Sequence, residues 1–214
     1  MIERSFATVM IIDDHPLLRK GLDQLLEFES ELKLIAEAES GEQGLTLAVH
    51  DEPDLIILDL NMPEMNGIDT LIALRDANIT SRILMLTVSD NVSDISQAIR
   101  AGADGYLLKD MKPELLLEEI KKAALGQMVI DPRLTEILIN ALYTRQTDPK
   151  PKLAELTIRE QEVAALLAEG QSNKQIALEL KISQETVKVH VKHVLNKLKL
   201  CSRVKVALYM AQQK

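Results

Sequence analysis

Short unbroken apolar runs alternate with segments of helical spacing along the first 125 residues. The runs lie at residues 9–12, 55–58 and 83–86, with weaker ones at 34–36 and 106–108. Such runs are typical of strands that are covered on both faces, as in a parallel sheet with helical crossovers. The segments between them, after Pro16 and around residues 68–72, 95–99 and 115–120, space their apolar residues as helices do. We therefore predict five strands and five helices in strict alternation, a doubly wound α/β domain over residues 1–126.

A polar segment separates this domain from the rest of the chain. Asp131 and Pro132 suit the N-cap and the first position of a helix over about residues 132–144. Residues 144–152, TRQTDPKPK, are polar and contain two prolines, which is typical of an extended tether. We predict a linker over residues 127–155.

From residue 156 onward every signal is helical. Thr157 with Glu160 has the spacing of a capping box, and so has Ser172 with Gln175. Serines at positions 183 and 202 are suited to begin two further helices. Because a tight turn at residues 181–183 joins two short capped helices, we predict an all-α helix-turn-helix domain of four helices over residues 156–214.

The composition is that of a folded protein. Of the 214 residues, 46% are hydrophobic, and the single cysteine, Cys201, cannot form an intramolecular disulfide. No apolar run approaches the ~18 residues of a membrane span. We expect a soluble cytoplasmic protein with no membrane partner.

The charge is divided between the two ends of the chain. The total is −8, but residues 1–125 hold 11 Lys and Arg against 24 Asp and Glu, while residues 170–214 hold 9 against 2. The first part therefore carries −13 and repels DNA phosphate, and the second carries +7 and attracts it. A solvated basic face would show the same pattern, so charge alone does not identify a nucleic-acid partner.

Polar residues follow four of the apolar runs. They are Asp13 and Asp14, Asp59, Thr87, and Lys109. Because the carboxyl ends of parallel strands meet at one edge of a sheet, we expect these side chains to converge. Three carboxylates in one pocket require a cation, and oxygen ligands with no Cys/His cluster favour Mg²⁺ over zinc.

A carboxylate beside Mg²⁺, a hydroxyl and an ammonium indicates phosphoryl transfer with aspartate as the covalent acceptor. Taken singly, each of these residues has an ordinary structural explanation, such as a helix cap or a strand end. Their joint spacing favours the functional interpretation. The histidines form no convincing metal set by spacing; they are His15, His50, His190 and His193.

The segments IIDDHP, LDLNMPEMNG, LTVSD and GADGYLLKD resemble the receiver domain of bacterial two-component response regulators over residues 8–125. The resemblance implies a flavodoxin-like fold. Lys109 precedes Asp110 where receivers commonly carry a cis Lys-Pro bond, and a non-proline cis bond costs ~3 to 4 kcal/mol. The resemblance also implies a role for each site residue. Asp59 is the phosphoacceptor, and Mg²⁺ is held by Asp13, Asp14, Asp59 and the backbone carbonyl of Asn61. Thr87 and Tyr106 are switch residues, and Lys109 binds the phosphoryl group.

The third helix of the second domain has one apolar and one polar face. Val187, Val191 and Val194 lie on the first, and Lys188, Val189, Lys192 and Asn196 share the opposite one. The polar face has the shape and charge to read bases in a DNA major groove. Phosphate contacts would come from Lys174, Lys197, Lys199 and Arg203.

The segment LTIREQEV…LAEGQSNKQIALELKISQETVKVHVKHVLNKLKLCSR resembles the LuxR-type output domain of NarL/FixJ response regulators. That resemblance makes the polar face of the third helix a DNA reader and the stripe Val204, Ala207 and Leu208 a dimerisation surface. It implies a phosphorylation-switched transcription regulator whose partners are a sensor histidine kinase, promoter DNA with inverted half-sites, and a second copy of the chain. TVSD and QSNKQIA favour the nitrate/nitrite regulators of the family.

Three alternatives remain open. The same architecture could serve a different signal. A haloacid-dehalogenase-like phosphohydrolase also uses a strand-end aspartate and Mg²⁺, but it should carry a second acid at position 61, which is Asn. A DNA-binding protein with a vestigial receiver should have lost the acid pair, the threonine or the lysine, and all are present. We expect a regulator with at most weak autophosphatase activity rather than an enzyme.

Overall fold

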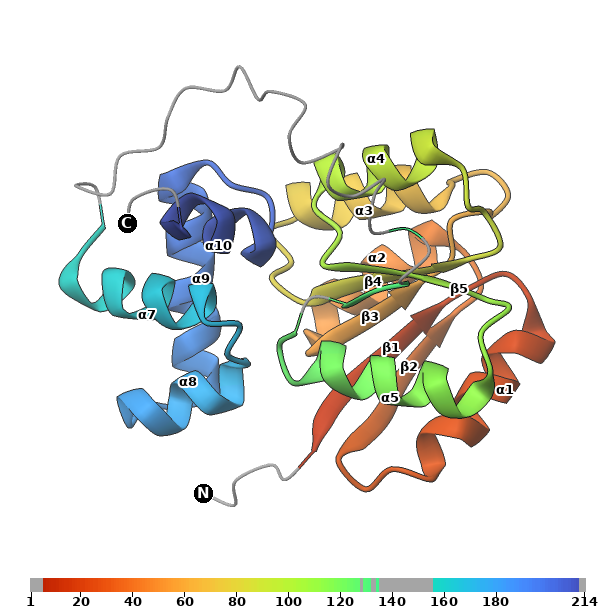
Figure 1. Cartoon of the computed structure of the whole chain (residues 1–214), viewed down its shortest axis with the longest axis horizontal. Coiled ribbons are helices and arrows are strands. Elements are labelled where there is room, and N and C mark those ends of the chain that lie inside the picture. The colour runs from red at the N-terminus through yellow and green to blue at the C-terminus, as the bar shows by residue number, and fades with distance from the viewer. Residues whose placement is uncertain (1–5, 128, 132–133, 135–155, 212–214) are drawn as a thin grey trace.

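The chain forms an α/β domain and a helical domain that lie side by side (Figure 1). The structure, a computed structural model, describes residues 6–127, 129–131, 134 and 156–211. The predicted linker helix over 132–144 and the tether over 144–152 lie outside these residues, apart from Leu134. Within the described part, no helix combines the length and apolar character needed to cross a membrane.

A single parallel sheet forms the centre of the α/β domain. Its strand order is β2-β1-β3-β4-β5-β6, with the switch in direction between β1 and β3. The strands are β1 (Ala7–Ile12), β2 (Leu32–Ala38), β3 (Leu55–Leu58), β4 (Arg82–Thr87), β5 (Gly105–Leu108) and β6 (Val129–Ile130).

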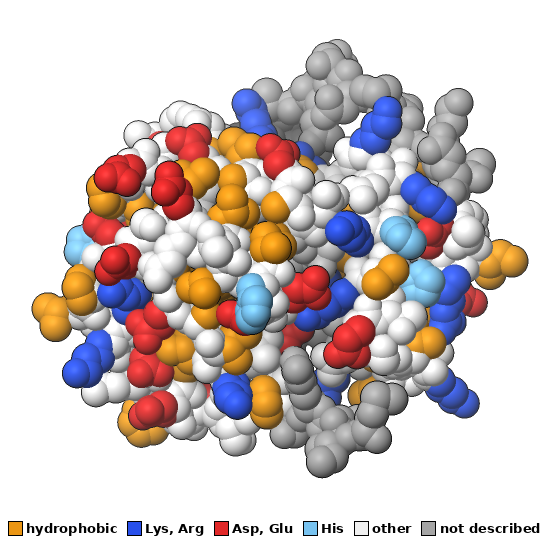
Figure 2. All heavy atoms as spheres, turned by 180° about the vertical axis from the view of Figure 1, so that it is seen from behind, with side chains coloured by type: hydrophobic (Ala, Val, Ile, Leu, Met, Phe, Trp, Pro, Cys, Tyr) orange, Lys and Arg blue, Asp and Glu red, His pale blue; other side chains and the backbone are white. Residues whose placement is uncertain are grey.

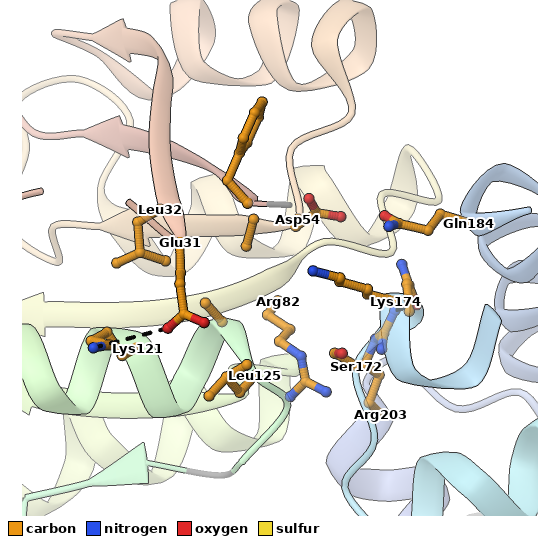
Figure 3. A pocket seen from close by; sticks show the side chains of 14 residues that line it. Glu31, Leu32, Asp54, Arg82, Lys121, Leu125, Ser172, Lys174, Gln184 and Arg203 are labelled. Carbon is orange, nitrogen blue, oxygen red and sulfur yellow. Dashed lines mark hydrogen bonds and ion pairs between the residues drawn. The ribbon is translucent and has the colours of Figure 1, made fainter. Parts of the chain in front are cut away.

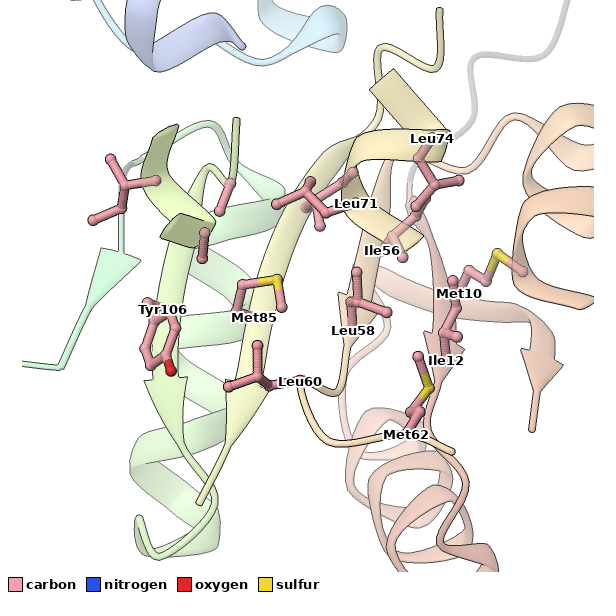
Figure 4. Packing of buried hydrophobic residues seen from close by; sticks show 14 of the residues in the cluster. Met10, Ile12, Ile56, Leu58, Leu60, Met62, Leu71, Leu74, Met85 and Tyr106 are labelled. Carbon is pink, nitrogen blue, oxygen red and sulfur yellow. The ribbon is translucent and has the colours of Figure 1, made fainter. Parts of the chain in front are cut away.

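Helices cover both faces of the sheet, as the unbroken apolar runs predict. Met10 and Ile12 of β1 face one hydrophobic cluster, whereas Val9 and Ile11 face the other. The first cluster, part of which Figure 4 shows, packs against α2 (Gly41–Asp51), α3 (Gly67–Asp76) and α4 (Val92–Ala101). The second packs against α1 (Pro16–Glu27) and α5 (Pro113–Ala124).

The sheet has six strands, so the prediction of five was wrong. The extra strand, β6, pairs in parallel with β5 through Gly105–Val129 and Tyr106–Ile130. Val129 is buried in the second cluster. A strand of two residues is too short to show an alternation of apolar and polar positions, and these two follow α5, so the prediction assigned them to the linker. Only the free edge of β5 makes this segment a strand.

The helical domain consists of α7 (Ile158–Ala168), α8 (Asn173–Leu180), α9 (Gln184–Leu198) and α10 (Arg203–Ala211). Both predicted capping boxes form, at Thr157 with Glu160 and at Ser172 with Gln175. The Ser183 side chain caps α9 by accepting a hydrogen bond from the Thr186 N–H. These caps satisfy backbone donors that would otherwise be unpaired at the helix starts.

The helical domain contacts the α/β domain at the edge of the sheet where the strands begin. Lys188 Nζ donates to the Glu52 carbonyl oxygen at 2.7 Å, just before β3. Lys205 Nζ donates to the carbonyl of Arg100, near the end of α4, at 2.8 Å. Gly126, with φ of 111°, meets the Gly170 carbonyl so closely that a Cβ there would collide with it. Asp13 and Asp59, which follow β1 and β3, lie at the opposite edge.

The Thr157 cap provides a test of the helical domain. Thr157→Ala removes the hydroxyl that accepts from the Glu160 N–H, and we expect it to lower the free energy of unfolding by about 1 kcal/mol. Thr46→Ala is the matched control, because it removes an exposed hydroxyl within α2 and leaves a better helix former. Urea unfolding followed by circular dichroism measures both; equal stability of the two variants would contradict a stabilising role of the cap.

Candidate functional site

Two buried carboxylates meet one ammonium at the carboxyl edge of the sheet. Asp13 follows β1, Asp59 follows β3, and each is only 2% exposed. Lys109, which follows β5, donates from Nζ to Asp13 Oδ2 at 2.7 Å and lies 2.9 Å from Asp59 Oδ2. All peptide bonds of the described residues are trans, the Lys109–Asp110 bond among them. The structure thus brings together three residues that lie far apart in the sequence.

Burial dominates the electrostatics of Asp59. It raises the pKa of the Asp59 carboxyl above its usual range, and the charge of Asp13 adds to this effect. The nearby Lys109 ammonium and the backbone N–H of Asn61 lower that pKa and offset part of the rise. Asp59 is therefore a carboxylate whose charge depends on cationic neighbours.

The acidic pocket fits a hard divalent cation. Asp13, Asp14, His15 and Asp59 each place one possible ligand atom within 4.8 Å of the others. In the described part of the chain, Asp14 Oδ1 and Asp59 Oδ2 are buried and have no hydrogen-bond partner of good geometry, although His15 Nδ1 lies 2.9 Å from the first and the Lys109 ammonium 2.9 Å from the second. Such orphaned oxygens favour another ligand, and a carboxylate set suits Mg²⁺.

His15 is a site residue that sequence reasoning missed. Its Nδ1 lies 2.9 Å from Asp14 Oδ1 and 3.3 Å from Asp13 Oδ1. The signal in the sequence was its position directly after the two aspartates in the motif IIDDHP, which contains none of the other three histidines. The ring is largely exposed, with 65% of its side-chain surface accessible. It can therefore approach or leave the pocket without disturbing the core.

The loop after β3 shapes the backbone around Asp59. The Gly67 N–H donates to the Leu60 carbonyl at 2.8 Å and closes the loop. A Cβ on Gly67 would collide with the Asp59 carbonyl oxygen, so only glycine allows α3 to begin this close. The Asn61 side chain is exposed, and the expected role of its backbone carbonyl as a metal ligand stays a prediction.

Thr87 and Tyr106 both bind the same loop residue, Ser89. Thr87 Oγ1 accepts a hydrogen bond from the Ser89 N–H at 3.1 Å, and the Tyr106 hydroxyl donates to the Ser89 carbonyl at 3.1 Å. Both side chains are fully buried. Burial raises the pKa of Tyr106 far above its usual value, so the phenol stays protonated as a donor. The two predicted switch residues are therefore linked through the start of the β4–α4 loop.

The face of α9 that we expect to read DNA is largely exposed. Val189 is 51% exposed, and Lys192 and Asn196 are also exposed. Lys188 is half-buried because its ammonium bonds to Glu52 of the other domain. In Figure 2, acidic side chains are spread over the α/β domain, while Lys and Arg predominate over the helical domain. This distribution agrees with the charge division of the sequence.

The four expected phosphate contacts differ in their surroundings. Lys174 and Lys199 are exposed. Lys197 donates to Glu160 at 2.7 Å; burial raises the pKa of Glu160, but hydrogen bonds from Lys197 and Thr157 outweigh this and lower it to about 2. Arg203 is 6% exposed and faces the α/β domain. The structure thus leaves Lys174 and Lys199 open to solvent, pairs Lys197 with Glu160, and buries Arg203.

The predicted dimerisation stripe lies on α10. Val204 and Ala207 are half-buried, and α10 packs mainly against α7. The Leu208 side chain lies outside the described set. The role of this stripe stays a prediction.

Two family models match the chain. The response regulator receiver domain matches residues 9–121, and the luxR family of bacterial regulatory proteins matches residues 154–210. The nitrate/nitrite response regulator NarL of Escherichia coli K12 is 46% identical over 97% of this chain and 96% of its own length. NarP of the same strain is 47% identical over 96% of this chain and 95% of its own. Both relatives are named as nitrate/nitrite response regulators, the group that TVSD and QSNKQIA favour.

Among solved structures, the response regulator ChrA of a heme-sensing two-component system is 32% identical. It superimposes with a TM-score of 0.52 and covers 98% of each chain.

Magnesium should stabilise the folded chain. A cation relieves the repulsion among Asp13, Asp14 and Asp59, and free Mg²⁺ at ten times its Kd adds about 1.4 kcal/mol. We therefore expect the Tm from differential scanning fluorimetry to rise with Mg²⁺ and to saturate at millimolar concentrations. Asp59→Asn should reduce this rise, and Asp76→Asn, an exposed carboxylate of α3, should keep it. No shift in the unaltered chain would contradict the acidic pocket as a metal site.

Proposed function

Because the chain belongs to the response regulators that join a receiver domain to a luxR-family DNA-binding domain, we propose that phosphoryl transfer to Asp59 controls its binding to DNA. One observation carries this proposal: the buried Asp59 carboxylate places Oδ2 2.9 Å from the Lys109 ammonium. A buried carboxylate with a cation beside it suits a phosphoryl acceptor, because the cation can neutralise the charge of the phosphoryl group.

The donor is the phosphohistidine of a sensor histidine kinase. An oxygen of Asp59 forms the new O–P bond as the N–P bond of the donor breaks, and the proton required by the leaving imidazole comes from solvent. Lys109 neutralises charge on the phosphoryl oxygens. Asp13, Asp14 and Asp59 would hold Mg²⁺, with the Asn61 carbonyl as a further ligand, and the ion supplies additional charge neutralisation when bound. Hydrolysis of the acyl phosphate is at most a weak autophosphatase activity.

The Thr87 hydroxyl binds the phosphoryl group. This hydroxyl now accepts from the Ser89 N–H, and donation to a phosphoryl oxygen on Asp59 would require this contact to change. Ser89 also accepts from Tyr106, so a shift of the loop alters the Tyr106 contact as well. Phosphorylation acts by favouring one pre-existing arrangement of these residues over another.

The contact between the domains restricts the DNA reader. The Lys188 ammonium donates to the Glu52 carbonyl, and the α/β domain lies beside that end of α9, so this domain blocks the approach of a DNA groove to Lys188. We propose that phosphorylation separates the domains, frees α9 for the major groove, and permits dimerisation through α10 on inverted half-sites. Lys188, Val189, Lys192 and Asn196 read bases, while Lys174, Lys197, Lys199 and Arg203 contact phosphates once they are free.

The signal that we propose is nitrate or nitrite. The support is the full-length similarity to NarL and NarP, whose names give this signal. The same architecture serving another signal is the alternative, since the chemistry of the acidic pocket is the same whichever signal the kinase detects. We place the protein in the cytoplasm, where promoter DNA and a reduced Cys201 are both expected.

Asp59→Asn tests the acceptor. It keeps the size of the side chain and removes the nucleophilic carboxylate, so we expect acetyl phosphate with Mg²⁺ to label the unaltered chain and not the variant. Asp76→Asn should be labelled normally. Phosphate incorporation is measured by intact mass; stoichiometric labelling of Asp59→Asn would show that another residue is the acceptor.

Lys192→Ala tests the reading face. The exposed Lys192 has no contact with the α/β domain among the described interactions, so its loss should weaken specific binding by about 1 to 3 kcal/mol without changing the contact between domains. Lys20→Ala, an exposed lysine of α1, controls for the change in net charge. The measurement is the Kd of the phosphorylated chain for selected genomic fragments; an unchanged sequence preference would remove Lys192 as a reader.

A further inference from the structure

A pocket between the two domains lies at the edge of the sheet where the strands begin (Figure 3). Arg82 and Asp54 line it from the α/β domain, and Ser172, Lys174 and Arg203 line it from the helical domain. Its volume is about 60 Å³. That is about four times the space that one water needs and well below the ~300 Å³ of a site for a nucleotide or a drug-sized ligand. A molecule with a few oxygen atoms fits it.

Arg203 is buried in this pocket with most of its donors unused. The residue is 6% exposed, and Nη2 donates to the side-chain oxygen of Asn173. Nε and Nη1 are buried and have no hydrogen-bond partner in the described part of the chain. Buried guanidinium donors are normally paired, because leaving them unpaired has a large desolvation cost. These two donors therefore indicate an acceptor that the protein itself does not provide.

A second buried guanidinium strengthens the case. Arg82, at the start of β4, is also 6% exposed, and among the described residues its acceptor across the domain boundary is the Gln171 carbonyl at 3.4 Å. Burial, first, and the charge of Arg82 lower the pKa of Arg203 to about 9, so the Arg203 guanidinium remains a cation at neutral pH. Lys174, on α8, extends toward the same space (Figure 3). Like charges held together away from water require a counter-anion.

The nearby carboxylates supply only part of it. The charges of Asp54 and Asp104 raise the pKa of both arginines, but burial outweighs them, and their hydrogen-bonded oxygens pair with other groups. Asp54 Oδ2 accepts from the Thr8 N–H and from the Thr8 hydroxyl, at 3.0 and 2.9 Å. Asp104 Oδ2 accepts from Arg75 at 2.7 Å and from the Ile83 N–H at 3.0 Å. The buried Asp104 Oδ1 forms no hydrogen bond with either guanidinium. Glu31 lies 4.0 Å from Lys121 at the far side of the pocket.

We propose that this pocket binds a small tetrahedral oxyanion such as inorganic phosphate or sulfate, held by Arg203 and Arg82 with Lys174 at its mouth. Guanidinium groups match such anions through paired hydrogen bonds. The site requires both domains, because Arg82 and Arg203 come from different ones. The anion consequently binds the arrangement with the domains in contact and stabilises it, and separation of the domains weakens its binding by the same factor.

The site would also make the small oxyanion compete with the phosphates of the DNA backbone. Lys174 and Arg203 are expected contacts to the DNA backbone, and the small anion engages the same groups while the domains are together. Oxyanion binding would thus oppose DNA binding more than an equal ionic strength of chloride does. This role goes beyond the phosphorylation switch, since it concerns the unphosphorylated chain and a site at the other edge of the sheet.

Sulfate titration of the full unphosphorylated chain tests the proposal. Sodium sulfate is compared with sodium chloride at equal ionic strength and without Mg²⁺, and the Tm and the isothermal titration heat are measured. Sulfate raises the Tm of many proteins through exclusion from their surface, but that rise does not saturate at low concentration. We expect a saturable rise in the unaltered chain and in Arg100→Gln, which removes an exposed arginine of α4 outside the pocket.

The variants decide where the anion binds. Arg203→Gln and Arg82→Gln should each weaken sulfate binding by about tenfold or more, and Lys174→Gln should weaken it less. If Arg203→Gln does not fold, Arg82→Gln and the exposed Lys174→Gln carry the test. A linear rise that is equal in all variants would overturn the site. Normal sulfate binding by Arg82→Gln would overturn its placement between the domains.

Small-angle scattering tests the coupling. Sulfate should lower the radius of gyration of the unaltered chain and not that of Arg82→Gln. Saturable binding with no change in either radius would contradict the stabilisation of the closed arrangement. Because Asp59 takes part in none of these measurements, their failure leaves the proposed phosphorylation switch untouched.

Discussion

The pairing of two buried carboxylates with the Lys109 ammonium is the interaction on which the α/β domain's chemistry depends. Asp13 and Asp59 stand at the ends of neighbouring strands, and β1 and β3 pair directly, so the sheet forces their charges together. Lys109 lies within 3 Å of both and offsets this repulsion. One cation for two buried anions leaves the pocket short of positive charge. A divalent cation removes that deficit, and a phosphoryl group adds negative charge next to Lys109. The same electrostatic imbalance thus explains both ligands.

The geometry places a constraint on how such a site can affect DNA. The acidic pocket lies at one edge of the sheet, and the helical domain contacts the other, across the ~16 Å spanned by β3 and its flanking residues. Direct contact between Asp59 and α9 is therefore impossible in this arrangement. Helix α4 joins the two edges: it begins just after Ser89, which Thr87 and Tyr106 hold, and it ends near the Arg100 carbonyl, which accepts from Lys205. Ten residues of helix span ~15 Å, which matches the distance to be covered.

Local signals in the sequence were enough for most of the architecture. Four-residue apolar runs predicted the central strands because both faces of a parallel sheet are buried, and the capping boxes at Thr157 and Ser172 predicted two helix starts because side-chain acceptors there pair with backbone donors three residues on. The meeting of Asp13, Asp59 and Lys109 followed from topology, since strand ends share an edge. These inferences use spacing along the chain or the order of strands, and both are visible in the sequence.

What could not be predicted depends on surfaces that meet only in the folded chain. Strand β6 has two residues and exists because the edge of β5 is available to it. His15 joins the acidic cluster because of the direction of the turn after β1, which the hydrophobic periodicity of the sequence does not predict. Arg203 looked like an ordinary phosphate contact, and its burial beside Arg82 appears only when both domains are present. Helical spacing cannot distinguish a cation that faces solvent from one that faces another domain.

The contact between the domains is weak enough to be switched. Among the described residues, hydrogen bonds donated by nitrogen pair Lys188 with Glu52, Lys205 with Arg100, and Arg82 with Gln171, and the Cys201 thiol donates a longer one to Arg100. At roughly 0.5 to 1.5 kcal/mol each, the three donated by nitrogen contribute about 1.5 to 4.5 kcal/mol together, before the ordering of the lysine side chains is subtracted. Moving a population from 1:99 to 99:1 needs ~5.5 kcal/mol of differential binding. A phosphoryl group that changes the Thr87 contact in one state has to supply a preference of this size, which exceeds the sum of the three hydrogen bonds.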